Sequence, residues 1–176
     1  EIMITIDGGT GKIMHNGLNV AAAPMIDQWR LSDHYTVGTS EGDITTNWER
    51  NDSNGYAKIG TGMSESSGIF TFPQTGIYLI QLMATSYGSS GATLFATVRV
   101  KGRKGGGSYA DKLQVSEQAY TTVAYGSLSG SFVFDVEDLS GDNIKMAAVA
   151  GTSGTKILGS STMQRTGLTF VRIGDT

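Results

Sequence analysis

The densest group of potential ligand atoms in the sequence is a cluster of acidic residues between two β-type runs. Carboxylates at this spacing bind Ca²⁺ when a shaped loop makes their oxygens converge. Asp and Gly are also the residues that tight turns prefer. Because Gly141 stands within the cluster, we interpret it as a hairpin turn and expect no metal there. The residues concerned are Asp135, Glu137, Asp138 and Asp142.

Residues for acid–base or nucleophilic catalysis are sparse. The chain has no cysteine and two histidines, His15 and His34, which lie far apart in the sequence. The segment GGSYA (106–110) only approximates the Gly-x-Ser-x-Gly elbow of serine hydrolases. A glycan-degrading or esterase domain would need paired carboxylates or a histidine-containing triad. We therefore expect a protein that is not an enzyme and needs no cofactor, with such a hydrolase as the alternative.

Anionic ligands are the third kind of chemistry to consider. GGTGK (8–12) lacks the Ser or Thr and the following helix of a phosphate loop, and GTSGTK (151–156) fails in the same way. A basic run could bind phosphates or acidic glycans, but charges on a strand more often keep an edge soluble. It comprises Arg99, Lys101, Arg103 and Lys104. With a net charge of −3 we expect no nucleic-acid partner, and no apolar run is long enough for membrane insertion.

The elements that must position these residues are strands. Gly, Ser and Thr make up more than a third of the chain, and short runs of β-type residues recur between them from Gln28 onward. Alternation of apolar and polar residues in 94–101 and 131–136 is typical of half-buried strands. Three further segments, 77–84, 144–150 and 167–173, are apolar in both phases. Strands covered on both faces without helices indicate that a neighbouring subunit covers the second face.

The first 27 residues differ from the rest. They contain two short strand-like pieces, each followed by a glycine turn, and too few apolar residues for a core of their own. We expect 1–27 to be a shaft or collar connector and 28–176 to be the head. Since the first residue is Glu1, we expect a piece of a longer protein whose preceding shaft would distinguish a fibre from a decoration protein.

The segment SGIFTFPQTGIYLIQLMA (67–84) resembles the signature of the jelly-roll head shared by complement C1q and the tumour-necrosis-factor superfamily. The family's Gly-x-Phe-x-x-Pro-x-x-Gly-x-Tyr run is matched in order. The stretches 47–60, 129–149 and 167–175 resemble the flanking strands. The resemblance implies an all-β antiparallel jelly-roll sandwich that forms a homotrimer. The matched residues are Gly68, Phe70, Pro73, Gly76 and Tyr78.

The phrases ESSGIFTFPQTGIY and TFVRIGDT also resemble C-terminal heads of tail-fibre and related structural proteins of marine bacteriophages. This resemblance implies a non-enzymatic virion component, assembled in a bacterial cytoplasm, that is the distal head of a tail fibre and binds a glycan or protein on the host surface. A capsid decoration or head-fibre protein that clamps capsid subunits is the alternative.

Two sets of residues follow from this expected architecture. The doubly apolar strands should meet at a three-fold interface through Tyr78, Leu82, Met146 and Phe170. Successive turns of a sandwich fall at opposite ends, so the turn at Pro73–Gly76 should lie beside the shaft. The loops around 87–91, 117–127 and 151–165 should lie at the far apex. There we expect receptor binding by Tyr87, Tyr120, Tyr125, Lys156, Gln164 and Arg165.

Overall fold

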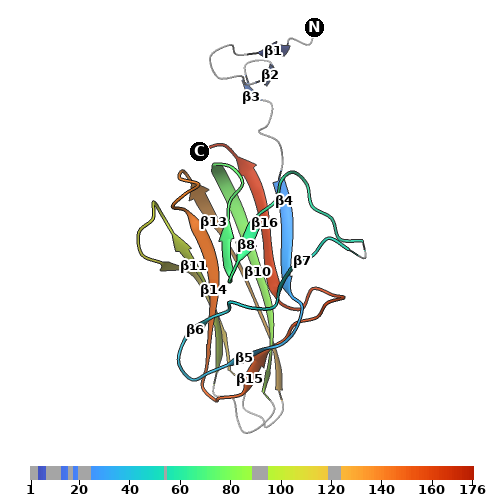
Figure 1. The fold of residues 1–176 in the computed structure, drawn as a ribbon, viewed down its shortest axis with the longest axis vertical. Coiled ribbons are helices and arrows are strands. Elements are labelled where there is room, and N and C mark those ends of the chain that lie inside the picture. Colours follow the sequence, from blue (N-terminus) through green and yellow to red (C-terminus); the bar gives the residue numbers. More distant parts are fainter. Residues whose placement is uncertain are drawn as a thin grey trace.

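The computed structural model describes residues 25–53, 55–88, 95–118 and 124–176, together with the backbone of three short N-terminal strands. The described part contains strands and turns but no helix, and hence none long and apolar enough to cross a membrane. Two antiparallel sheets face each other across one core (Figure 1). The expected all-β antiparallel sandwich is confirmed.

The first sheet has seven strands, and β10 lies at its centre. β10 pairs with β13 along its whole length, and with β16 and then β15 on the other side. β4 and β7 extend the sheet beyond β16, and β5 extends it beyond β15. The strands are β4 (Met25–Leu31), β5 (Tyr35–Val37), β7 (Trp48–Arg50), β10 (Gly76–Gly88), β13 (Ala124–Val136), β15 (Thr155–Ile157) and β16 (Gly167–Gly174).

The second sheet has six strands in the order β12, β11, β14, β9, β8, with β6 paired to β14. Its strands are β6 (Gly42–Asp43), β8 (Ser64–Ser66), β9 (Ile69–Thr71), β11 (Ala96–Arg103), β12 (Ala110–Glu117) and β14 (Asn143–Ala150). A separate small sheet contains β1 (Ile4–Ile6), β2 (Ile13–His15) and β3 (Leu18–Asn19). The N-terminal segment therefore does contain short strands, as expected.

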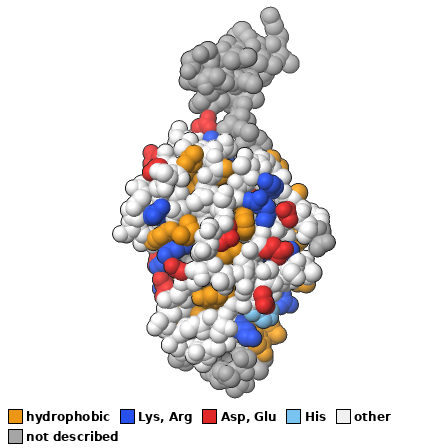
Figure 2. Space-filling model, viewed as in Figure 1, with side chains coloured by type: hydrophobic (Ala, Val, Ile, Leu, Met, Phe, Trp, Pro, Cys, Tyr) orange, Lys and Arg blue, Asp and Glu red, His pale blue; other side chains and the backbone are white. Residues whose placement is uncertain are grey.

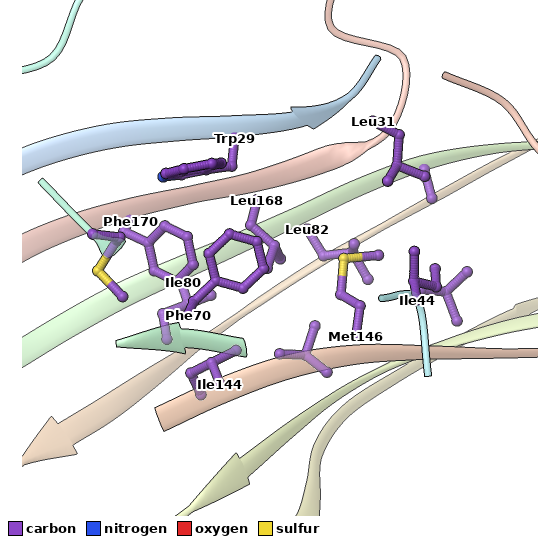
Figure 3. Packing of buried hydrophobic residues seen from close by; sticks show 14 of the residues in the cluster. Trp29, Leu31, Ile44, Phe70, Ile80, Leu82, Ile144, Met146, Leu168 and Phe170 are labelled. Atoms are coloured by element: carbon purple, nitrogen blue, oxygen red, sulfur yellow. The ribbon is translucent and has the colours of Figure 1, made fainter. Parts of the chain in front are cut away.

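The core contains the four residues that we had expected at a three-fold interface. Tyr78, Leu82, Met146 and Phe170 are each at most 2% exposed and pack between the two sheets of a single chain. Figure 3 shows three of them, Leu82, Met146 and Phe170, among the side chains that both sheets direct inward. A side chain buried in this way has no surface to offer to a neighbour. The interface assignment is therefore wrong for these four residues.

The glycines of the hairpin motif are required by the backbone. Gly68 has φ +80° in the turn before β9, and Gly76 has φ +138° where β10 begins. A Cβ on Gly76 would lie 2.4 Å from the carbonyl oxygen of Gly174. The Tyr78 hydroxyl donates to the carbonyl oxygen of Gln74 at 2.8 Å, which ties the turn to the strand, and burial raises the pKa of Tyr78 to about 12. Both glycines therefore serve the turn geometry that the motif predicts.

Strand pairing fixes the two ends of the sandwich. Met25, where the chain enters, pairs with Arg172, and Arg172 pairs with Tyr78 just after the Pro73–Gly76 turn. We call this the stalk end, and the turn lies there as expected. The far ends of β10, β11 and β14 lie at the opposite, apical end (Figure 1). β4 begins at Met25, so the sandwich includes residues 25–27, which the expected boundary had placed in the connector.

Candidate functional site

The outer face of the seven-stranded sheet carries a continuous row of aliphatic side chains near the stalk end. Leu79 on β10 pairs with Val133 on one side and Val171 on the other, and Val171 pairs with Ile26. Ile59, bridged to Ile26, extends the row. Val133 is 59% exposed and Ile59 48%. We call these five residues the aliphatic row.

One step toward the apical end, the same face becomes polar without becoming charged. Gln81 pairs with Ser131 and with Thr169, and Thr169 pairs with Gln28. The Gln28 Nε2 group donates to the Thr169 hydroxyl at 3.2 Å. These four residues form an amide–hydroxyl row that leaves donors and acceptors available to a partner. Met83 lies beyond them and is 42% exposed.

The outer face of the six-stranded sheet is different because it carries paired charges. Lys101 Nζ lies 2.6 Å from Glu41 and 2.9 Å from Asp111, and Arg99 pairs with the same two acids. The hydrogen bond from Lys101 is the main cause that lowers the pKa of Glu41, against the effect of burial. Lys145 pairs with Asp43 at 2.6 Å. Charges that satisfy one another in this way are typical of a solvated surface.

The basic run Arg99, Lys101, Arg103 and Lys104 could bind anions or keep a strand edge soluble, and its contacts decide between these two interpretations. Arg99 and Lys101 belong to the ion-pair network just described. Arg103 Nε donates to the Gly141 carbonyl oxygen at 3.0 Å, and Lys104 Nζ contacts Asp142 at 2.8 Å. The four basic side chains thus have partners within the chain, which favours a structural role over an anion-binding one. Figure 2 shows acidic and basic side chains intermixed with small hydrophobic patches over the visible face.

The acidic cluster forms the turn that its composition predicts. The Asp142 side chain is fully buried and accepts hydrogen bonds from Lys104 Nζ and from the backbone N–H groups of Gly105, Glu137 and Asp138. Burial opposes ionisation, but these donors outweigh it and lower the pKa of Asp142 to about 2. Asp142 therefore joins the loop after β11 to the loop after β13. Over the described ranges, no three His, Cys, Asp or Glu side chains are arranged to hold a metal.

Four of the six expected receptor-binding residues come together at the apical end of the outer face of the seven-stranded sheet. Tyr87 pairs with Tyr125 across β10 and β13, with ring centroids 4.8 Å apart, and Tyr125 is 70% exposed. On its other side Tyr87 pairs with Lys156 on β15. The Thr85 hydroxyl donates to the Arg165 carbonyl oxygen at 3.2 Å. Ser127 pairs with Thr85 and lies on the same face. We define the apical patch as the six residues that lie together here: Thr85, Tyr87, Tyr125, Ser127, Lys156 and Arg165.

The other two expected residues are Tyr120 and Gln164, and Gln164 does not join this patch. Tyr120 lies outside the described residues. Gln164 accepts a hydrogen bond from Asn51 Nδ2 at 2.9 Å and donates to the Trp29 carbonyl oxygen at 3.3 Å. The segment 151–165 is also not one apical loop, because it contains β15 and then runs back along β4. Gln164 is therefore a structural residue on the flank.

The local sequence pattern does not reveal the buried polar centre to which Gln164 belongs. The Arg30 side chain is 0% exposed although it lies on the outward phase of β4. Its Nη1 donates to Asn51 Oδ1 at 2.7 Å, and its Nη2 lies 3.3 Å from Glu49 Oε1. The Ser161 carbonyl oxygen accepts from Arg30 Nη2 at 2.5 Å, and the Tyr56 ring centre lies 6.0 Å from the guanidinium, so the two loops that contain Ser161 and Tyr56 cover this part of the sheet. Nothing in the local pattern around Arg30 indicates that distant loops fold over it.

A second buried centre lies on the inward face of β4. The fully buried Asp27 accepts hydrogen bonds from Trp29 Nε1 at 3.0 Å and from the Met63 backbone N–H at 2.7 Å. Arg50 lies 3.3 Å from the Asp27 carboxylate and 4.8 Å from the centre of the Trp29 ring. Asp27 thereby holds the chain between β7 and β8 against the sandwich. Its role is structural.

Comparison with known proteins gives a fold match. No family model and no curated protein matches the chain. A crystal structure of murine APRIL determined at pH 5.0 matches with a TM-score of 0.63 at 19% identity, covering 85% of this chain and 99% of that one. A second one at pH 8.5 gives a TM-score of 0.61 at 19% identity with the same coverage. Eiger TNF from S. frugiperda matches with a TM-score of 0.64 at 11% identity, covering 88% of this chain and 96% of that one. The chain therefore has the antiparallel jelly-roll fold of the tumour-necrosis-factor type.

Proposed function

We propose that this chain forms the homotrimeric distal head of a bacteriophage tail fibre and binds a receptor on the host surface. One observation carries the proposal. The outer face of the seven-stranded sheet exposes aliphatic side chains in a row with no ion pair, whereas the opposite face of the sandwich is covered by paired charges. An exposed apolar surface of this kind marks a contact with another protein.

Copies of the same chain are the partner that best fits this face. The aliphatic row and the amide–hydroxyl row contain no charged side chain, so they can oppose their own copies without like-charge repulsion. Of the nine large hydrophobic residues that are exposed in the described part of the chain, five lie on or beside this face: Ile59, Met83, Tyr125, Val133 and Ile173. The amide–hydroxyl row beside them can form hydrogen bonds between subunits and so fix their register. We expect an obligate trimer to bury more than about 2,000 Å².

The position of the two ends supports a receptor-binding role. The chain enters the sandwich at the stalk end, and the apical patch lies at the other end of the same face. Leu79 and Tyr87 are eight residues apart on β10, which corresponds to roughly 26 Å along a strand. An aliphatic contact near the stalk therefore leaves three apical patches facing away from the virion. Weak binding at each of three sites gains strength through avidity.

The proposal is tested with the full chain by sedimentation equilibrium and by binding of the labelled protein to a panel of marine bacteria. We expect a mass of three chains at micromolar concentration and saturable binding to host cells. The matched variants are Val133→Arg on the aliphatic row and Ser66→Arg on the other sheet. Val133→Arg should abolish both assembly and cell binding, and Ser66→Arg should affect neither. A wild-type trimer that binds purified capsids but no cell would contradict the fibre-head function.

A further inference from the structure

The apical patch has an aromatic platform on its surface. Tyr125 is 70% exposed, and its ring lies beside that of Tyr87 at an interplanar angle of 42°. Exposed tyrosine rings offer a flat apolar surface with a hydroxyl at the rim, to which the C–H face of a sugar ring or another planar group can pack.

The two cations of the patch differ from most cations of the molecule. Arg30, Arg50, Arg99, Lys101, Lys104, Lys145 and Arg172 each form an ion pair. Lys156 and Arg165 form none within the described part of the chain, and both lie partly exposed beside the tyrosines or Thr85. Glu117, at the end of β12, contacts the inward-facing Ser86, and burial raises the pKa of Glu117. The positive charge of the patch is therefore available to a ligand.

From this geometry we infer that the apical patch binds an anionic carbohydrate. The tyrosine rings pack against the sugar, Lys156 and Arg165 bind its carboxylate or sulfate groups, and the Thr85 and Ser127 positions add hydroxyls for its hydroxyl groups. The inference deepens the proposed receptor-binding function, on which it rests, by naming the chemical class of the receptor. A nucleic acid fits less well, because the chain carries a net charge of −3 and only two unpaired cations lie at this site.

The direct test measures binding of the wild-type assembly to immobilised polygalacturonate, dextran sulfate and neutral dextran. The first two separate carboxylate from sulfate as the source of the negative charge. We expect binding to at least one of them, weakened by added salt, and no binding to dextran. Lys156→Ala and Arg165→Ala should each weaken it by about tenfold, the loss expected for one charged hydrogen bond.

Matched variants separate the patch from general effects of charge and shape. Lys112→Ala removes an exposed lysine of the six-stranded sheet and should leave binding unchanged. Tyr125→Ala should weaken binding about as strongly as Lys156→Ala, whereas Tyr125→Phe keeps the ring and should retain most of it. Each variant is checked for the wild-type mass and thermal unfolding temperature.

Three results would overturn the inference. The first is a wild-type protein that binds cells but neither anionic polysaccharide. The second is polysaccharide binding that survives the substitutions of Lys156, Arg165 and Tyr125 by Ala. The third is equally tight binding of single-stranded oligo-dT through the same residues. Failure of the proposed function would differ from all three. In that case the protein would bind no cells, while the polysaccharide assay would still report on the patch.

Discussion

Replacement of the buried Asp142 by Asn tests whether a carboxylate, rather than packing, holds the stalk-end loops together. Oδ2 accepts from Lys104 Nζ at 2.8 Å and from the backbone N–H groups of Glu137 and Asp138, and Oδ1 accepts from the Gly105 N–H at 2.7 Å. An amide offers only one acceptor oxygen to these donors and carries no charge. At least one buried donor is then left without a partner.

The pKa of Asp142 gives the magnitude. It falls from the ordinary 3.8 to about 2 in the folded chain. At about 1.36 kcal/mol per pKa unit, the ionised form contributes about 2 kcal/mol to folding. Because the folded pKa is the lower one, this contribution is complete above about pH 5 and is lost as the pH falls through 4 toward 2. Asp142→Asn should therefore cost about 2–4 kcal/mol at pH 7 and about 2 kcal/mol less near pH 2.

The assay is urea unfolding of wild type and Asp142→Asn at pH 7 and near pH 2, at one protein concentration so that assembly contributes equally. Asp111→Asn is the control, because the ion-paired Asp111 side chain is itself 45% exposed. This replacement should change the free energy of unfolding by less than about 1 kcal/mol. A stability difference between wild type and Asp142→Asn that is the same at both pH values would refute the role of the carboxylate charge.

Three further perturbations have definite outcomes. Gly76→Ala should lower the free energy of unfolding by about 2 kcal/mol or more, measured in urea, because its Cβ would lie 2.4 Å from the Gly174 carbonyl oxygen at φ +138°; an unchanged value would contradict the turn geometry. Asn51→Leu should cost about 2–3 kcal/mol in the same assay, since it removes the acceptor 2.7 Å from Arg30 Nη1, and a neutral result would show that water replaces it. Deletion of residues 1–24 should leave a folded head with a lower thermal unfolding temperature, whereas loss of the β-sheet circular dichroism signal would place that segment within the sandwich.

The sequence predicted the fold from two kinds of local evidence. The hairpin motif carries glycines that the backbone requires, and the alternating segments 94–101 and 131–136 overlap strands β11 and β13. Strand β10 explains the wrong interface assignment. Where both phases of a strand are apolar, alternation does not say which phase faces the core. The interface was therefore assigned to Leu82, which is buried, and not to Leu79, which lies on the outer face. Gln81 was the available signal, because a lone amide marks the outward phase.

The candidate site was predictable only in part. Tyr87 and Tyr125 were both expected in loops at the apical end, and the structure pairs them directly on β10 and β13. The sequence did not predict that Gln164 lies on the flank while Arg165 lies in the apical patch. The position of Gln164 depends on hydrogen bonds to Asn51 and Trp29, two residues that are more than a hundred positions away in the sequence. Local patterns do not encode the loops that cover Arg30, and the paths of such loops are decided by long-range contacts.

The central claim is that the aliphatic row and the amide–hydroxyl row, on the outer face of the seven-stranded sheet, join three copies of this chain. Sedimentation equilibrium of the intact protein at micromolar concentration tests it most directly. Three chains of 18.5 kDa each should sediment as one species of about three times that mass. Val133→Arg, placed on a side chain that is 59% exposed, should shift this species to the mass of one chain. A wild-type protein that sediments as a single chain would contradict the claim.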